Sequence, residues 1–281
     1  MLYTGIKLFV LDANLPYIAA ALFAFAAFLY ASVGHGGASG YLAVMALLGF
    51  APLVFRSTSL SLNIAVASIA FIVFARQTPH IGAWLWRILL PFVVTAMPAA
   101  YFAAQWQLDT KIHKVLVGFV LLYSAWRLLA GLTEKQAALV EKQATLVQAS
   151  PRQNTPAQWA GRAAIGLALG VLSGLTGVGG GIFLSPLLIF MGLCTVRQSA
   201  PIAAAFIVLN SISGLAGAWQ AGAIFSPHLT MWLLAAVSGG IFGARWGAKR
   251  VNARVLRWML AAVLVVAGLK LLSYLTVKHY I

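Results

Sequence analysis

The sequence predicts an all-α polytopic membrane protein with two homologous halves arranged as inverted repeats. Each half is expected to hold a glycine-broken helical hairpin plus three transmembrane helices. Of the 281 residues, 62% are hydrophobic and 8% are charged, whereas a soluble domain has about 25% charged residues. Apolar runs of nearly twenty residues recur, which is enough to cross a hydrocarbon core of about 30 Å as helices. Two glycine clusters at matching places, residues 33–40 and 176–181, interrupt these runs; we call them the first and second glycine breaks.

The charge balance favours an anionic substrate. The sequence contains 19 Lys and Arg residues and four Asp and Glu residues, which gives a net charge of +15. In a soluble protein this would suggest nucleic acid, but here the cations cluster at span ends, so the expected partner is the lipid bilayer and not nucleic acid. Cation carriers and proton pumps keep an Asp or Glu inside the membrane. The four acids here all lie outside or at the edges of the apolar runs: Asp12, Asp109, Glu134 and Glu141.

The first transmembrane repeat is predicted over residues 1–131. An apolar run over 16–33 begins with Pro16, which suits the first turn of a helix, and residues 1–15 show no features of a cleaved signal peptide. The first glycine break and a short run over 41–50 follow. The remaining three spans are expected at 57–75, 84–104 and 112–131.

A polar linker over residues 132–160 separates the halves. Within it, residues 134–140 and 141–147 repeat with a seven-residue spacing. This pattern predicts a short amphipathic helix, at the interface or continuing the preceding span, with a connecting role. Pro151 and Pro156 are expected to end that helix.

The second transmembrane repeat, residues 161–281, follows the same order. A run over 161–175 leads into the second glycine break and a short run over 181–192, and spans are expected at 199–217, 229–248 and 253–275. The register supports a duplication, because the glycines at 34, 36 and 37 lie 143 positions before those at 177, 179 and 180. Lys111, Lys114 and Arg127 lie 143 positions before Arg254, Arg257 and Lys270.

The distribution of cations favours inverted halves. If each half has an odd number of crossings, thirteen Lys and Arg lie on the linker side and six on the other; with four crossings per half the split is ten against nine. The positive-inside rule therefore places the linker in the cytoplasm and both termini outside.

The glycine breaks are the predicted binding site. Each glycine inside a helix costs roughly 1 kcal/mol relative to Ala, so a cluster marks a place where the helix stops. Matching interruptions in two halves point to a transporter's binding site; close helix packing is the alternative. The half-helix after each break presents free N–H groups and about half a positive charge, which bind an anion. The predicted substrate-binding residues are Gly34, His35, Gly36, Gly37, Ser39, Asn63, Thr176, Gly177, Gly179, Gly180, Gly181 and Asn210.

Other side chains could complete this site. Ser57 and Thr58 in the first half, and Gln198 and Ser199 in the second, begin the spans that follow the short runs. Arg56 and Arg197 are candidates for anion capture, although snorkelling to the interface is the favoured role. Asn63 and Asn210 could instead be hydrogen-bonding glue between helices. His35, where the second break has Val178, could bind substrate, carry a proton or make a structural hydrogen bond.

Enzymatic chemistry is not expected. The sequence shows no catalytic Ser/His/Asp set, no carboxylate pair and no metal-spaced His cluster, so no catalytic residue, metal or cofactor is predicted. Cys194, the lone cysteine, is expected to pack as a small apolar side chain. His80 and His228 are predicted at the interface, and most of the nine Trp are candidates for the aromatic belts.

Two motifs resemble a known family. Residues 32–41, SVGHGGASGY, and residues 174–186, GLTGVGGGIFLSP, are similar to the paired glycine motifs of the sulfite exporter TauE/SafE family. The resemblance covers nearly the whole chain, including the polar linker and Asn210-Ser211, and the second motif is the more specific. It implies a multi-pass transporter in a bacterial inner membrane that moves sulfite, an organosulfonate or a related sulfur anion, chiefly outward.

Several functions stay open at this stage. An inside-negative potential drives anions outward by about 2.3 kcal/mol per charge per 100 mV, so export needs no coupling ion, although a proton-linked carrier using His35 is compatible. Proton-coupled uptake of a sulfur oxyanion or organic anion is the first alternative. A non-transporting scaffold and a channel are others, and an intramembrane enzyme fits least. The sequence does not decide between a monomer and a homodimer.

Overall fold

The computed structural model describes residues 14–78, 81–106, 108–130, 155–247 and 253–273. All regular structure in these ranges is helical, which confirms the predicted helical class. Within them, four helical stretches are long and apolar enough to cross a membrane: Pro52–Ala75, Ile81–Gln105, Pro156–Thr176 and Gln198–Gln220. Four shorter apolar helices accompany them, including Leu15–Ala31, Ala38–Leu48 and Gly181–Phe190 beside the two breaks.

The first half follows the predicted order of elements. Its helices are α1 (Leu15–Ala31), α2 (Ala38–Leu48), the short 3₁₀ helix η2 (Pro52–Val54), α3 (Phe55–Ala75), α4 (Ile81–Trp84), the π-helical turn η3 (Leu85–Leu89), α5 (Leu90–Gln105) and α6 (Thr110–Leu129). The half-helix α2 begins three residues before the predicted start at 41, because the helix resumes directly after Gly37. Asp109 caps α6 by accepting a hydrogen bond from the Lys111 N–H, so this acid lies at a helix end as expected.

The second half begins earlier than predicted. Its helices are α8 (Pro156–Thr176), α9 (Gly181–Phe190), α10 (Val196–Gln220), α11 (Leu229–Gly247) and α12 (Ala253–Ser273). Pro156 was expected to end the linker, but it occupies the first turn of α8, where a missing N–H costs nothing. Thr155 and Gln158 form a capping box there. The predicted amphipathic linker helix lies outside the described residues.

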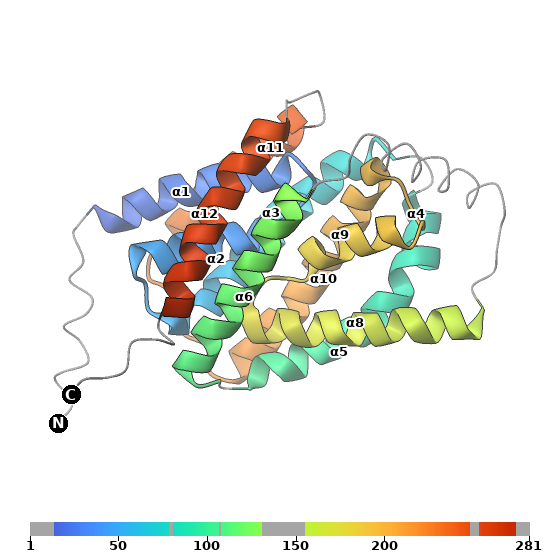
Figure 1. Ribbon diagram of the computed structural model, residues 1–281, viewed down its shortest axis with the longest axis horizontal. Coiled ribbons are helices and arrows are strands. Elements are labelled where there is room, and N and C mark those ends of the chain that lie inside the picture. Colours follow the sequence, from blue (N-terminus) through green and yellow to red (C-terminus); the bar gives the residue numbers. More distant parts are fainter. Residues whose placement is uncertain (1–13, 79–80, 107, 131–154, 248–252, 274–281) are drawn as a thin grey trace.

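Helices of the two halves interleave. The first helix of each half packs against a helix of the other half: α1 lies on α11, and α8 lies on α5. The helices that follow the half-helices, α3 and α10, pack against each other, as do α6 and α12. Figure 1 shows α8 alongside α5 and the red α12 crossing beside the green α6. Segments more than a hundred residues apart therefore build the centre of the molecule together.

Glycines let two of these helix pairs approach closely. On α8, a Cβ added at Gly170 would overlap the Ala96 carbonyl of α5, and on α11 a Cβ added at Gly243 would overlap the Phe28 carbonyl of α1. Each of these glycines belongs to a row of three glycines spaced four residues apart, and such a row lies on one helix face. The rows are Gly166, Gly170 and Gly174 on α8, and Gly239, Gly243 and Gly247 on α11. Close packing thus explains these glycines, which lie outside the two breaks.

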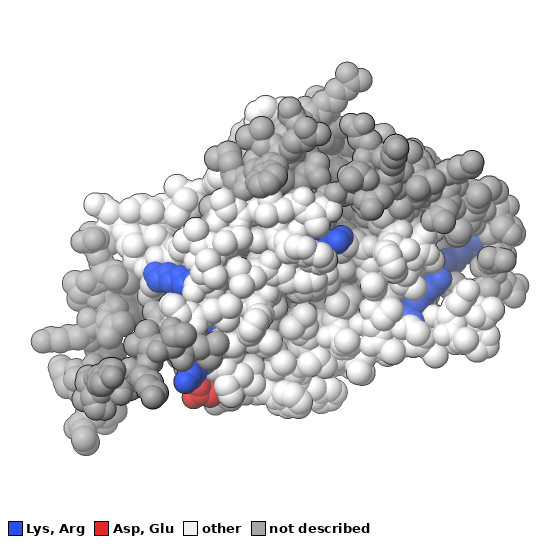
Figure 2. Space-filling view, viewed as in Figure 1, with Lys and Arg blue, Asp and Glu red and all other residues white. Residues whose placement is uncertain are grey.

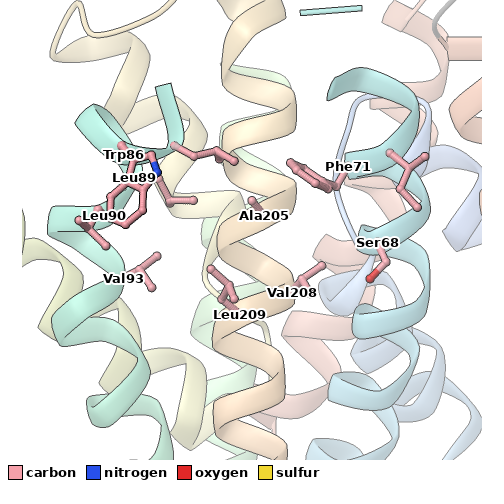
Figure 3. Close-up of a pocket in the computed structure, with 11 residues that line it drawn as sticks. Ser68, Phe71, Trp86, Leu89, Leu90, Val93, Ala205, Val208 and Leu209 are labelled. Carbon is pink, nitrogen blue, oxygen red and sulfur yellow. The ribbon is translucent and has the colours of Figure 1, made fainter. Parts of the chain in front are cut away.

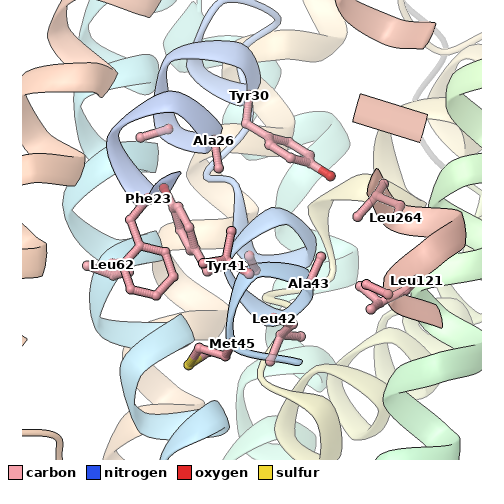
Figure 4. Packing of buried hydrophobic residues seen from close by; sticks show 14 of the residues in the cluster. Phe23, Ala26, Tyr30, Tyr41, Leu42, Ala43, Met45, Leu62, Leu121 and Leu264 are labelled. Carbon is pink, nitrogen blue, oxygen red and sulfur yellow. The ribbon is translucent and has the colours of Figure 1, made fainter. Parts of the chain in front are cut away.

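The half-helix α2 lies at the centre of the larger hydrophobic core. Residues 38–46 are all buried, and Figure 4 shows Tyr41, Leu42 and Met45 surrounded by residues of α1, α3, α6 and α12. Cys194 is buried in the second core cluster, as expected of a packing residue. Trp232 is an exception to the belt role expected of most of the tryptophans. It is fully buried, and its indole N–H donates to the Pro16 carbonyl at 3.0 Å.

The outer surface is typical of a protein that contacts lipid. On the face in Figure 2 the described residues are nearly all uncharged, and Lys and Arg appear as isolated spots. Leu234 and Phe242 of α11 are each 68% exposed and share one helix face. Among the residues whose exposure is described, five tryptophans near helix ends are more than half exposed, which suits aromatic belts: Trp86, Trp106, Trp126, Trp219 and Trp246.

Candidate functional site

The first glycine break separates α1 from α2 by six residues. Gly34 and Gly37 have φ angles of +82° and +96°, which L-residues with side chains rarely adopt. Gly37 is the N-cap of α2 and provides no side-chain cap. Within the described residues, the backbone N–H groups of residues 36–40 have no hydrogen-bond partner. The break therefore presents a row of free donors at a helix N-terminus.

The second break follows a similar path at two of its three matched glycines, but Gly179 has a φ of +77° whereas its counterpart Gly36 has no positive φ. Gly177 has a φ of +82°, equal to that of Gly34, and Gly180, the N-cap of α9, has a φ of +77°. The N–H groups of residues 179–182 have no hydrogen-bond partner among the described residues. Each break thus combines the end of one helix with the uncapped start of another, as the sequence predicts.

Asn63 lies between the two breaks. A Cβ added at Gly36 would overlap its amide oxygen, and a Cβ added at Gly179 would lie 2.6 Å from its amide nitrogen. Ile207 of α10 contacts the same two glycines. The crossing of α3 and α10 therefore brings the breaks together, although they are more than 130 residues apart in the chain.

Several buried polar atoms around the breaks have no partner within the described residues. The Asn63 amide donates to the Val178 carbonyl at 3.1 Å, but its oxygen accepts no hydrogen bond. Both amide atoms of Asn210 and the Ser211 hydroxyl are also unpaired, and these side chains are at most 1% exposed. The glycine positions place Asn210 beside Gly180 and Ser211 beside Gly179. Buried polar groups without partners are costly, so this cluster suits a bound polar ligand or water.

His35 connects the first break to the second half-helix. Its Nδ1 is 3.1 Å from the Val33 carbonyl oxygen, which can only accept, so Nδ1 carries a proton. The other ring nitrogen, Nε2, is 3.1 Å from the Ser185 hydroxyl of α9. In the neutral ring Nε2 accepts, so Ser185 donates. The ring is half-buried, and it links elements 150 residues apart.

The remaining predicted residues are held by internal hydrogen bonds. Ser39 pairs with the Tyr30 hydroxyl, and the Thr176 hydroxyl donates to the Leu172 carbonyl at 2.7 Å. Gly181 packs against Ile207. These contacts shape the breaks and do not leave side chains free for a ligand.

Two polar residues expected to complete the site lie elsewhere. The Ser57 hydroxyl donates to the Ile224 carbonyl at 2.5 Å, in the connection between α10 and α11. Gln198 is used in the capping box that starts α10. Thr58 and Ser199 are both buried near the starts of α3 and α10. Arg197 belongs to the first turn of α10.

Arg56 anchors helix ends. Its guanidinium donates to the Ala104 carbonyl at 2.6 Å and to the Leu175 carbonyl at 3.1 Å. These carbonyls lie at the C-terminal ends of α5 and α8, where the helix dipole is negative. The Cα of Arg56 also packs against Gly177, so Arg56 supports the second break.

Replacing Arg56 should therefore lower stability more than it changes anion selectivity. A hydrogen bond to a charged group contributes about 1.5–3 kcal/mol, so we expect Arg56→Gln to lower the free energy of unfolding by roughly 2–4 kcal/mol. The measurement is denaturant or thermal unfolding in detergent, beside anion binding by the folded fraction. Arg245→Gln is the control, because Arg245 is exposed. Lost anion affinity with unchanged stability would instead assign Arg56 to anion capture.

Sequence reasoning did not assign several side chains that lie at the breaks, among them Ser185 and Ser59. Ser185 holds His35, and the Ser59 hydroxyl donates to the Gly177 carbonyl at 2.8 Å. Both bonds join elements far apart in the chain, and a lone Ser in an apolar run carries no local sign of such a partner. Ser185 does fall within the second motif, residues 174–186.

The arrangement offers neutral donors to a ligand. Each break has free N–H groups at the start of a half-helix, Asn63 lies against glycines of both breaks and Asn210 lies beside Gly180, while Asp109, the acid within the described residues, caps α6. Among the described residues no three His, Cys, Asp or Glu side chains group together as metal ligands do. This chemistry is suited to binding a small anion.

The chain matches known proteins over most of its length. Residues 18–271 match the family described as Sulfite exporter TauE/SafE. The chain is also similar to "Probable membrane transporter protein y4hK" of Sinorhizobium fredii (strain NBRC 101917 / NGR234), with 35% identity over 246 residues, which cover 88% of this chain and 94% of that protein. No solved structure matches the chain. The family match includes both glycine breaks and the helices α3 and α10.

Proposed function

Because the chain belongs to the sulfite exporter TauE/SafE family of membrane transporters, we propose that it exports a small sulfur-containing anion across the bacterial inner membrane. Sulfite or an organosulfonate is the proposed substrate. The family supports the substrate class, and the neutral donors at the breaks support a small anion. We propose no enzymatic activity and no cofactor, since transport of such an anion requires neither.

The convergence at Asn63 is the observation that carries this proposal. One amide lies against glycines of both breaks, and each break has free N–H groups at the start of its half-helix. We propose that the anion binds here, held by these N–H groups and by the amides of Asn63 and Asn210. Of the residues predicted from the sequence, the glycines of both breaks and His35 shape this site, while Ser39 and Thr176 support it.

We also propose that the two halves, 1–131 and 161–281, are inverted repeats. The contacts support a two-fold relation between the halves, because they are preserved when the halves are exchanged: Gly34 packs against Ala200, and Gly177 against Arg56. Asn63 and Ile207 likewise occupy matching places, 144 positions apart. The distribution of Lys and Arg supports the inverted orientation. An inverted arrangement places the polar linker 132–160 in the cytoplasm by the positive-inside rule.

The proposed energy source is the membrane potential. For a monovalent anion it supplies about 2.3 kcal/mol per 100 mV, which corresponds to a concentration ratio of about fifty. A proton-coupled uptake permease is the second candidate, and the hydrogen bond between His35 and Ser185 favours it. A histidine that links the first break to the second half-helix could couple its protonation to the distance between them.

Flux measured in liposomes tests the function. Purified protein is reconstituted, and the distribution of sulfite or methanesulfonate is followed while potassium and valinomycin set the potential. We expect saturable movement out of the negative compartment, reaching a ratio of about fifty at 100 mV for a monovalent anion. Protein-free liposomes are the control.

The alternatives give different outcomes in the same experiment. A ratio that follows the pH gradient at zero potential would support proton-coupled uptake and overturn the uniporter mechanism. Flux that does not saturate would indicate a channel. The absence of flux for both anions, with folded protein, would favour a non-transporting scaffold.

A further inference from the structure

An apolar cavity lies between α3, α10 and the start of α5. Its volume is about 590 Å³, within the range of small-molecule sites. Figure 3 shows side chains from three helical segments around it: Phe71 on α3, Trp86, Leu89 and Val93 around η3 and α5, and Leu209 on α10. Ser68 contributes a hydroxyl, but that hydroxyl donates to the Ile64 carbonyl of its own helix. The cavity therefore presents an apolar wall to its occupant.

The cavity is separate from the glycine breaks. On α10, Ile207 contacts the breaks, whereas Leu209 lines the cavity. Two residues correspond to about 200° around a helix, so these side chains point to opposite sides of α10. On α3 the same contrast holds between Asn63, at the breaks, and Ile72, at the cavity. The α3–α10 pair thus forms a wall between the two sites.

The π-helical turn η3 forms part of the cavity lining. Leu85, Trp86 and Leu89 belong to this five-residue turn and all line the cavity. A π turn is rare and frequently marks a functional site, because it displaces side chains from the regular helical positions. The three segments that surround the cavity are also among those long and apolar enough to cross a membrane. An apolar cavity between segments of this kind suits an acyl chain.

A cation and an interfacial aromatic residue lie at or near the cavity. Arg76 follows Ile72 by four positions, one turn further along the same face of α3, and it is exposed. Within the described residues its guanidinium makes no hydrogen bond or ion pair. Trp86 is 71% exposed, as is typical of side chains at the level of lipid headgroups. Trp86 is part of the cavity lining, and Arg76 lies one helical turn beyond the lining residue Ile72.

We propose that this cavity binds an anionic phospholipid, with one acyl chain between α3, η3 and α10 and the headgroup phosphate beside Arg76. Basic residues beside cavities between transmembrane helices recognise such headgroups. This lipid site is distinct from the proposed transport site and does not depend on the transported substrate.

Lipid binding to delipidated protein tests the proposal. Phosphatidylglycerol or phosphatidylcholine is added to the purified full-length protein in detergent, and bound lipids are counted by native mass spectrometry. We expect at least one retained phosphatidylglycerol and weaker binding of phosphatidylcholine. Arg76→Gln should weaken phosphatidylglycerol binding about fivefold. Ala205→Phe, which fills the cavity from α10, should remove the retained lipid of either class.

Two matched variants serve as controls. Arg245→Gln removes an exposed arginine beside an exposed tryptophan at the end of α11, outside the cavity. Leu234→Phe adds bulk to an exposed position of the same helix. Equal loss of lipid in Arg245→Gln, or unchanged lipid in a folded Ala205→Phe protein, would overturn the site. Equal retention of phosphatidylglycerol and phosphatidylcholine, unaffected by Arg76→Gln, would overturn the headgroup assignment. This comparison of the two lipids can be made even if Ala205→Phe does not fold.

Discussion

Asn63→Asp should reduce anion affinity by about a thousandfold. The substitution keeps the size and shape of the side chain between the two breaks, but replaces a neutral amide with a carboxylate. Two like charges about 4 Å apart at an effective dielectric constant of about 20 repel by about 4 kcal/mol, which is about three decades in affinity. The lost donor to the Val178 carbonyl adds to the effect. Calorimetry or ligand-induced thermal shifts with sulfite and methanesulfonate would measure it.

The neutral variant Asn63→Ala is the matched control for charge. It removes the same amide without adding a carboxylate, so we expect about a tenfold loss, the value of one hydrogen bond. Binding to Asn63→Asp should recover in part as the pH falls, because protonation removes the repulsion. Equal affinities of the Asp and Ala variants at neutral pH would contradict an anion at this position. Stronger binding of a cation by the Asp variant would point to a different substrate class.

Much of the site could be predicted because glycine leaves a local signal. Repeated glycines cost stability in a helix, so the two clusters mark where α1 and α8 end and where α2 and α9 begin. The 143-residue spacing predicts a duplication; Gly34 and Gly177 share a φ of +82°, whereas Gly179 has a positive φ and Gly36 does not, so the two breaks match in part. Free N–H groups follow from the start of any helix that lacks a side-chain cap.

The long-range contacts could not be predicted in the same way. Asn63 was expected near the site or as glue between helices, but its place against Gly36 and Gly179 depends on how α3 crosses α10. Trp232 carries the same local signal as a belt tryptophan, and its burial follows from packing against Phe23 and Phe50. The start of α8 was misplaced because Pro156 both ends and begins helices, and the Thr155 cap decided between them.

Gly179→Ala should abolish transport, and the structure supplies a closely matched control. Gly179 has a φ of +77°, and an added Cβ would lie 2.6 Å from the Asn63 amide nitrogen and 2.9 Å from the Ser211 hydroxyl. Gly222, in the connection after α10, has a φ of +78° with nothing within 4 Å of an added Cβ. Both substitutions carry the same backbone strain, of order 1–2 kcal/mol. Of the two substitutions, only Gly179→Ala brings a methyl group into steric conflict with the polar cluster.

The difference in flux between these two variants therefore separates the effect of the site from the effect of backbone strain. We expect Gly222→Ala to transport at a rate near that of the unmodified protein, with a small loss of thermal stability. Gly179→Ala should lose at least 90% of flux (about 1.4 kcal/mol per tenfold change), because the methyl group displaces the Asn63 amide and occupies space between the breaks. Flux in liposomes and thermal unfolding of the same preparations are the measurements. Equal flux in the two variants at equal stability would mean that the breaks are packing features and that the anion crosses elsewhere.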